Sequence, residues 1–186
     1  IQASDWSSDV CSSDLHVQNL TISALLIAFG IAIPMFMPIK LIIGPASYTL
    51  ASHVPLFIAL FISPAVAVAV ALGTTLGFFF AGFPFVIVVR ALTQLVFVLI
   101  GAYWLQKSPK LLDNAKLTFG FAVGINLIHA LFEFLAVLVL TNAGELSASY
   151  VGVLVGLIGL GTLVHGTIDF YLALYCWRFL KRIGSL

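Results

Sequence analysis

The stretch FVIVVRALTQLVFVLIGAYWL, residues 85–105, is long and apolar enough to cross a bilayer as a single helix. Such a span needs about 20 mainly apolar residues. Arg90 is the exception within it, because a charge at the bilayer centre costs roughly 2.5–3.5 kcal/mol on insertion scales. A residue that costs this much usually lines a cavity or makes a polar contact inside a helix bundle. Arg90 is therefore a candidate functional residue.

The rest of the chain has the same character. Of its 186 residues, 62% are hydrophobic and 8% are charged, and its mean hydropathy is +1.18. Soluble domains are typically about 45–50% apolar and about 25% charged. The net charge of +1 comes from basic residues scattered among apolar runs, which gives no indication of a nucleic-acid-binding patch. With only Cys11 and Cys176, the chain cannot build a disulfide framework. The sequence predicts an integral membrane protein.

Five further apolar runs accompany residues 85–105. Together they predict an all-α membrane protein, a bundle of six transmembrane helices. The second run is the shortest, and the junction at Pro64 is either a tight hairpin between two helices or a kink in one. The six expected spans are Leu20–Met37, Ala51–Ile62, Pro64–Phe80, Phe85–Leu105, Leu117–Leu140 and Tyr150–Phe179.

Basic residues indicate how the six spans are oriented. Cytoplasmic loops of membrane proteins carry an excess of lysine and arginine. With six spans and the N-terminus inside, only Lys40 lies outside, whereas five spans would leave the loops and the tail in conflict. The sequence therefore predicts cytoplasmic N- and C-termini. The expected cytoplasmic basic residues are Lys107, Lys110, Lys116, Arg178, Lys181 and Arg182.

The first fifteen residues differ from the rest. Asp5–Leu15 reads DWSSDVCSSDL, which is polar and repeats Ser-Ser-Asp. It resembles a translated sequencing-library adapter, so we interpret residues 1–15 as a non-native segment and residues 16–186 as a single transmembrane domain. The natural N-terminus is then missing, and Cys11 has no role. The alternative is a disordered Ser/Asp-rich tail.

The polar residues inside the spans are predicted to lie at two levels. Counting about 1.5 Å of rise per residue puts His53, Arg90, His129 and Glu133 together in the outer half of the membrane. Asn126, His129 and Glu133 share one helix face. His165 and Asp169 are one turn apart on the last span and are expected deeper, toward the cytoplasm, where a structural hydrogen bond between them is the favoured interpretation.

Arg90 has two interpretations. It can form a buried ion pair with Glu133, since charges inside membranes tend to pair. It can instead remain free to bind a carboxylate ligand, which suits its planar guanidinium. Gln94, one turn further along, either orients Arg90 or faces the cavity.

The loop IIGPASYTLASHVP, residues 42–55, is apolar yet rich in glycine, proline and small hydroxyl residues. Irregular backbone at a membrane is tolerated where it lines or covers a cavity. We expect an outer lid over a pocket formed by the second, fourth, fifth and sixth spans, with Tyr48, Phe83 and Phe85 as aromatic walls. An ordinary external loop is the alternative.

Small residues recur every four positions on the first span, at Ala24, Ala28 and Ala32. A face of this kind lets another helix approach closely. It serves either packing within the bundle or docking onto a partner subunit, and the pattern alone does not choose between them.

These segments resemble the S components of energy-coupling factor (ECF) vitamin transporters, over about His16 to the C-terminus. ALLIAFGIAIPMFMP (24–38), IIGPASYTLASHVP (42–55) and ALGTTLGFFFAGFPFVIVVRA (71–91) are most similar to the niacin-type S components. The resemblance implies a bacterial cell-membrane subunit that captures a vitamin from outside. It also implies docking, through the alanine face, on a transmembrane coupling subunit driven by two ATP-binding subunits. The chain itself contains no G-x-x-x-x-G-K-[ST] phosphate loop.

The resemblance implies a small carboxylate vitamin, with nicotinate favoured, and neither a cofactor nor enzymatic activity. Arg90 would bind the carboxylate, and histidine or asparagine side chains the ring nitrogen. The same pocket would also suit pantothenate. The candidate substrate-binding residues are Arg90, His53, His129, Glu133, Asn126, Gln94 and Tyr48.

Two other classes of protein remain as alternatives. An intramembrane metal-dependent hydrolase would use the i, i+4 pairs His129–Glu133 and His165–Asp169 as zinc ligands. The different depths expected for these pairs, and the absence of an H-E-x-x-H motif, argue against it, so no metal site is predicted. A purely structural membrane protein would bind no ligand and would tolerate Arg90→Ala.

Overall fold

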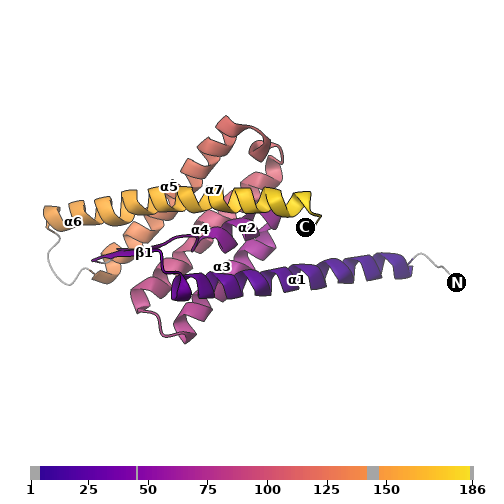
Figure 1. Cartoon of the computed structure of the whole chain (residues 1–186), viewed down its shortest axis with the longest axis horizontal. Coiled ribbons are helices and arrows are strands. Elements are labelled where there is room, and N and C mark those ends of the chain that lie inside the picture. The colour runs from indigo at the N-terminus through magenta and orange to yellow at the C-terminus, as the bar shows by residue number, and fades with distance from the viewer. Residues whose placement is uncertain (1–4, 45, 142–146, 185–186) are drawn as a thin grey trace.

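The computed structural model describes residues 5–44, 46–141 and 147–184. Within these ranges the fold contains six helices, as the sequence predicts (Figure 1). The last helix is continuous and consists of α6, a π-helical turn η2, and α7. The helical elements are α1 (Asp5–Phe36), α2 (Val54–Ile62), α3 (Pro64–Phe80), α4 (Phe85–Lys107), the 3-10 turn η1 (Leu111–Asp113), α5 (Ala115–Thr141), α6 (Ala148–Leu154), η2 (Val155–Leu160) and α7 (Gly161–Arg182).

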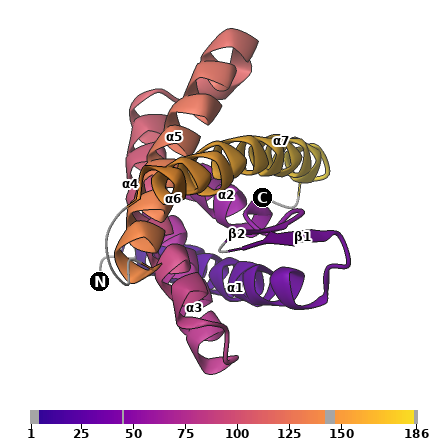
Figure 2. The same ribbon diagram turned by 90° about the vertical axis from the view of Figure 1, so that its left-hand side faces the viewer.

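A β-hairpin departs from the all-α prediction. Strands β1 (Lys40–Ile43) and β2 (Ala46–Thr49) pair antiparallel, with Lys40 opposite Thr49 and Ile43 opposite Ala46. All four residues of β1 are exposed, whereas Ala46 and Thr49 of β2 are buried. The hairpin therefore lies on the bundle through β2, between α1 and α7 (Figure 2). This is the segment that the sequence identifies as a lid.

Four helices are long and apolar enough to cross a membrane. α3, with 17 residues, is a shorter apolar helix. α2 has nine residues, about 14 Å, which is half the thickness of a bilayer core. The expectation that residues 51–62 span the membrane is therefore not met by α2 alone, which is instead buried from Pro55 to Leu60. The four long segments are His16–Phe36, Phe85–Lys107, Ala115–Thr141 and Ala148–Arg182.

The junction at Pro64 is a break between two helices and not a kink in one. Ser63 is fully extended, with φ −167° and ψ 159°, so the α-helical path stops there. Its hydroxyl then accepts a hydrogen bond from the backbone N–H of Val66, at 3.2 Å. A serine cap followed by proline at the first helical position is a strong helix start. The short sequence Ser63-Pro64 thus ends α2 and begins α3.

A cluster of aromatic rings joins four helices in the core. Phe57 of α2 packs on Phe97 of α4, with ring centroids 5.6 Å apart, and on Phe170 of α7, at 5.4 Å. Phe121 of α5 packs on Phe170 at 5.9 Å. All four side chains are fully buried. These rings fix α2, α4, α5 and α7 relative to one another and support the polar residues that the same helices carry.

α1 packs on α3 through glycines and not through its alanines. Ile27 and Ile31 of α1 lie directly over Gly73 and Gly77 of α3, where any larger residue would collide with them. A side-chain atom at Gly30 would come within 2.7 Å of the Thr74 hydroxyl. Ala24 and Ala28, by contrast, are exposed, and Ala32 is half-buried. The alanine face is therefore not used for packing of α1 against the described part of the bundle.

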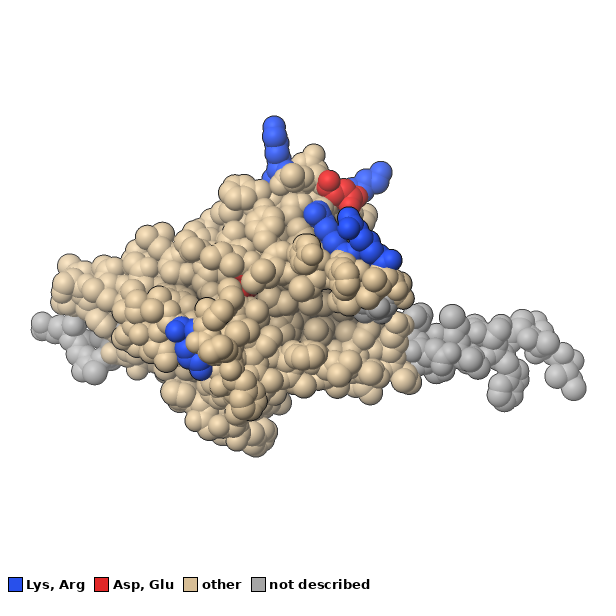
Figure 3. Space-filling model, in the orientation of Figure 1, with Lys and Arg blue, Asp and Glu red and all other residues tan. Residues whose placement is uncertain are grey.

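Basic side chains gather at one end of the molecule. The N-terminal end of α1 and the C-terminal end of α7 lie at the same end, away from the hairpin (Figure 1). Figure 3 shows most lysine and arginine side chains at that end and one isolated basic residue on the hairpin side. Lys40 begins β1, whereas the remaining exposed basic residues lie in the α4–α5 connection, at the start of α5 and at the end of α7.

Candidate functional site

An ion pair between α4 and α5 lies at the centre of the polar residues. Arg90 Nη2 donates to Glu133 Oε2 at 3.0 Å, and both residues are buried. Thr162 of α7 donates its hydroxyl to the same carboxylate oxygen at 2.8 Å. The rest of the guanidinium is poorly satisfied. Nη1 is 3.5 Å from the Ser47 hydroxyl, and Nε is buried without a hydrogen-bond partner among the described residues. Arg90 is thus both paired and able to donate further hydrogen bonds.

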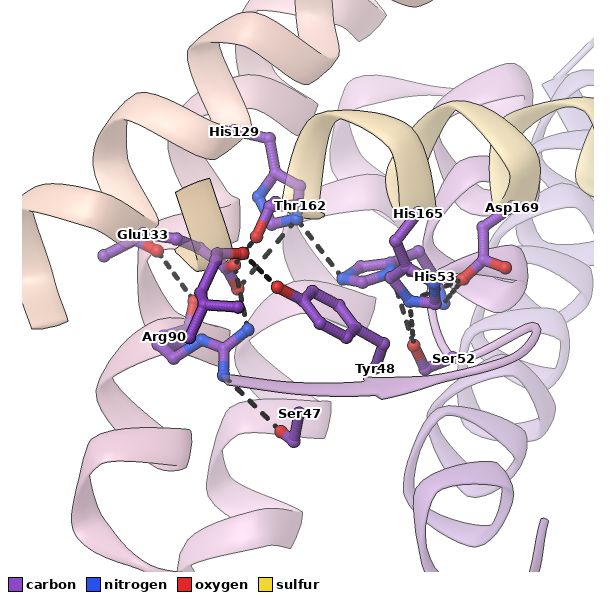
Figure 4. Close-up of polar contacts among 12 residues, drawn as sticks. Ser47, Tyr48, Ser52, His53, Arg90, His129, Glu133, Thr162, His165 and Asp169 are labelled. Atoms are coloured by element: carbon purple, nitrogen blue, oxygen red, sulfur yellow. Dashed lines mark hydrogen bonds and ion pairs between the residues drawn. The ribbon is translucent and has the colours of Figure 1, made fainter. Parts of the chain in front are cut away.

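Three histidines from separate parts of the chain adjoin this pair (Figure 4). His53 precedes α2, His129 lies on α5 and His165 on α7. The ring of His53 lies between the other two, with centroid distances of 4.9 Å to His129 and 5.1 Å to His165. His129 Nε2 is 3.3 Å from His53 Nε2 and 4.0 Å from Glu133 Oε1. A chain of polar contacts therefore connects Glu133 to His53.

Asp169 extends this chain to the turn before α2. It is fully buried and accepts hydrogen bonds from the backbone N–H groups of Ala51, at 2.8 Å, and His53, at 2.9 Å. It also contacts His53 Nδ1 at 3.1 Å and His165 Nε2 at 3.4 Å. Ser52 Oγ lies 3.2 Å from His165 Nε2. Asp169 thus holds both the backbone and the imidazole of His53 in place.

A small cavity opens beside the ion pair. Its volume is about 70 Å³. Both polar and apolar side chains line it. Its lining consists of Pro34, Ser47, Thr49, Ser52, His53, Thr74, Phe78, Ile87, Arg90, Ala91, Gln94 and Glu133.

A second cavity adjoins the first on the hairpin side. It lies between the hairpin and the turn that joins α3 to α4, and Lys40 is among its lining residues. Pro34, Ser47, Thr49 and Ile87 line both cavities. Strand β2 therefore lies between the inner cavity and the outer surface of the hairpin. This is the position that the sequence predicts for a lid.

The structure divides the seven candidate substrate-binding residues into two groups. The first group, Arg90, His53, Gln94 and Glu133, lines the cavity. The second group, His129, Asn126 and Tyr48, lies behind or beside it. His129 reaches the cavity through His53 and Glu133. That any of them binds substrate stays a prediction.

Asn126 and Tyr48 both make internal contacts. Asn126 donates to the Ala122 carbonyl at 2.9 Å, and its amide oxygen is packed against Gly166. The Tyr48 hydroxyl donates to the Leu157 carbonyl in the π-helical turn, and its ring packs on His165 with centroids 5.7 Å apart. Tyr48 thus attaches the hairpin to the last helix.

The depth expected for the polar residues of the last span was wrong. His165 and Asp169 are not at a separate level, because both contact the same His53 ring system that contacts His129. His165 Nε2 lies 3.4 Å from Asp169 Oδ2, which is a direct contact and not the hydrogen bond that was expected.

The walls of the cavity also differ from the expectation. A pocket among the second, fourth, fifth and sixth spans was expected, but the described lining includes Pro34 of α1 and Thr74 of α3 and no residue of the last helix. Phe85 is 64% exposed and cannot form a wall of the cavity, since it faces outward from the start of α4. Phe83 stacks on Phe78 with centroids 4.5 Å apart, and Phe78 is the aromatic residue that lines the cavity.

Several hydroxyl residues of the site carry no distinctive sequence signal. Ser47, Thr49 and Ser52 belong to the loop already noted for its small hydroxyl residues. Thr162 is seven residues before Asp169, so the two share a helix face. Thr74 of α3 lies at the close approach of α1 and also lines the cavity.

Donor atoms in this network are close enough together for a metal ion. Those of His53, His129 and Glu133 lie within 4.8 Å of one another, and so do those of His53, His165 and Asp169. Hydrogen bonds account for the same spacing, because His53 contacts Asp169 through Nδ1 and His129 through Nε2. We describe the cluster as a hydrogen-bonded network and do not assign it to a metal. The expectation of no metal site stays a prediction.

A bundle of membrane-spanning helices around a small polar cavity defines a membrane protein that binds or transports a small molecule. The chain is 48% identical over 163 residues to the niacin transporter NiaX of Lactococcus lactis subsp. cremoris (strain MG1363), an alignment that covers 85% of this chain and 72% of that protein. The chain therefore belongs to the same family as that transporter, the S components of ECF vitamin transporters. It is a multi-pass protein of the bacterial cell membrane and not an enzyme. No family model matches the chain, and no solved structure matches it.

Proposed function

We propose that the chain is the nicotinate-binding S component of an ECF-type transporter. It would capture the vitamin outside the cell for ATP-driven uptake by separate subunits. The observation that carries this proposal is the 48% identity to a niacin transporter, combined with a buried arginine that lines a small cavity. Nicotinate is one aromatic ring with one carboxylate, and the cavity offers a cation and an apolar wall.

The unused donors of Arg90 support a carboxylate ligand. Within the part of the chain that the structure describes, its Nε has no hydrogen-bond partner and its Nη1 makes a long contact with Ser47. A bound carboxylate would accept charge-assisted hydrogen bonds from these donors. Phe78 and Ile87 supply apolar contacts for the ring, and Gln94, Ser52 or His53 can donate to its nitrogen.

The exposed alanine face supports docking on a membrane partner. We propose that Ala24, Ala28 and Ala32 contact the transmembrane coupling subunit, which two ATP-binding subunits drive. Exposed small residues let a partner helix approach closely, and the described bundle leaves Ala24 and Ala28 uncovered.

We further propose six membrane passes with both termini in the cytoplasm. The gathering of basic side chains at the end opposite the hairpin supports this orientation (Figure 3). The hairpin would then cover the cavity from outside. We also propose that residues 16–186 form a single transmembrane domain and that residues 1–15 are a non-native segment.

Binding of radiolabelled nicotinate to the purified full chain tests the proposal. We expect saturable binding, with weaker competition from nicotinamide, pantothenate and other vitamins. Arg90→Gln should raise the Kd about 10- to 150-fold, since a hydrogen bond to a charged group contributes about 1.5–3 kcal/mol. Lys110→Gln, a matched change at an exposed basic residue, should leave the Kd unchanged.

Two outcomes would contradict the proposal in different ways. Stronger binding of another vitamin would keep the S-component family and change the substrate. An Arg90→Gln variant that is folded and binds nicotinate normally would remove Arg90 from the site.

A further inference from the structure

The buried charges around the cavity do not balance. Within the described residues, the buried charged side chains are Arg90, Glu133 and Asp169, so one positive charge faces two negative ones. Asp169 contacts His53 and His165, and Glu133 lies 4.0 Å from His129. Each carboxylate thus lies next to an imidazole, the side chain that changes charge near neutral pH.

A carboxylate ligand would increase this imbalance. With neutral imidazoles the net charge is 1 − 2 = −1 before binding, and a bound anion would make it −2. An uncompensated buried charge is costly, and buried groups usually change their protonation state instead. The ligand would also share Arg90 with Glu133, so Glu133 would need a second cationic neighbour.

We propose that the cavity binds its carboxylate ligand together with one proton, which His129 holds beside Glu133. The inference rests on the proposed capture of nicotinate. The proton comes from solvent through His53, which lines the cavity and whose Nε2 lies 3.3 Å from His129 Nε2. His129 is fully buried, and none of the described residues forms a hydrogen bond with its Nδ1, so one ring nitrogen is not engaged. The imidazolium then takes over part of the compensation that Arg90 gives to Glu133.

The groups that face this histidine pair come from every neighbouring element. Glu133 and Asn126 come from α5, and His165 and Asp169 from α7. Arg90 of α4 reaches the pair through Glu133, and Tyr48 of β2 reaches it through His165. Asp169 already contacts two imidazoles, His53 and His165. Glu133 contacts one imidazole, His129, which is therefore the site where a proton offsets the ligand's charge most directly.

Calorimetric titration of the full chain with nicotinate tests this. Measurements at one pH, in phosphate and in Tris, report the protons taken up from the difference in observed heat. We expect about one proton per nicotinate and a Kd that rises up to tenfold per pH unit above neutral. His16→Gln, at an exposed histidine far from the cavity, should keep the same uptake.

Two variants separate a proton site from a general loss of structure. Glu133→Gln removes one negative charge, so ligand binding leaves the cavity at −1 without a proton. We expect this variant to bind nicotinate with an affinity that does not change with pH and with no proton uptake. His129→Gln should lose the uptake and also bind more weakly, because nothing replaces the imidazolium. If His129→Gln fails to fold, Glu133→Gln alone decides.

Three results would overturn the inference. Normal nicotinate binding with equal heats in both buffers would overturn the proton uptake and leave the proposed function intact. Absence of any nicotinate binding would instead overturn the proposed function. Undiminished proton uptake in Glu133→Gln would place the proton elsewhere. All titrations contain EDTA, and binding that is lost in EDTA and restored by Zn²⁺ would show that a metal ion supplies the charge instead.

Discussion

Asp169 stabilises a strained turn that brings His53 to the cavity. Ala51 has φ +66°, a left-handed conformation that costs a residue with a side chain roughly 1–2 kcal/mol. Its N–H donates to one carboxylate oxygen of Asp169, and the N–H of His53 donates to the other. The carboxylate thus compensates for the strain and orients the histidine that follows.

Asp169→Asn should lower both stability and affinity. An amide has one acceptor oxygen, so its NH₂ group would face one of the two backbone N–H donors. Loss of a hydrogen bond to a charged group costs about 1.5–3 kcal/mol. We expect a Tm lower by several degrees and a nicotinate Kd raised about tenfold, measured by thermal unfolding and binding in detergent. Asp113→Asn, at an exposed carboxylate, is the control. An unchanged Tm would mean that the turn does not need Asp169.

Residue types inside the apolar spans identified most of this network in advance. The Arg90–Glu133 pair could be predicted because residues on neighbouring spans at one level tend to pair. The position of Tyr48 could not be predicted. Its hydrogen-bond partner is the backbone carbonyl of Leu157, 109 residues away, and a backbone carbonyl carries no sequence signal. Asn126 shares the helix face of Glu133, yet packs on Gly166 outside the cavity lining, since one helix face meets several neighbours.

At the level of elements, α1 has two distinct faces. Ile27 and Ile31 contact the glycines of α3, whereas Ala24 and Ala28 remain exposed. A bulky residue on the first face would disturb the fold. A bulky residue on the exposed face would disturb only what binds there.

Ala28→Leu should therefore weaken assembly and spare folding. We expect at least a tenfold lower yield of complex when the variant is co-purified with the coupling subunit, because leucine keeps the partner helix at a distance. Nicotinate binding by the isolated variant should be unchanged. Ala148→Leu, at an exposed alanine that begins α6, should assemble normally. Intact assembly of Ala28→Leu would assign the alanine face to lipid.

Apolar length predicted the helices well and the hairpin not at all. Residues 85–105 were expected as a span, and α4 covers Phe85–Lys107. β1 has no alternation of polar and apolar residues, since Leu41, Ile42 and Ile43 are all apolar and all exposed. A four-residue strand without alternation gives no periodic signal.

Across the whole molecule, counting residues misplaced the last helix. A rise of 1.5 Å per residue gives depth only for a helix that begins and ends at the membrane surfaces. The segment Ala148–Arg182 has 35 residues, about 52 Å, which exceeds a bilayer core of about 30 Å. Counting residues from the ends of this helix therefore placed His165 and Asp169 too deep in the membrane. In the structure they lie beside His53.

The orientation of the whole bundle can be tested with single cysteines. Lys40→Cys and Lys110→Cys, in a chain whose Cys11 and Cys176 are replaced by serine, report on opposite ends of the molecule. A membrane-impermeant maleimide should label position 40 in intact cells and position 110 only after permeabilisation, because basic loops remain in the cytoplasm. Both positions should react in permeabilised cells, which controls for local burial. Labelling of position 110 alone from outside would mean that the bundle is inverted. Labelling of both positions would require an even number of passes between them. The cavity, the hairpin above it and the exposed alanine face can serve capture from outside only if position 40 faces the exterior.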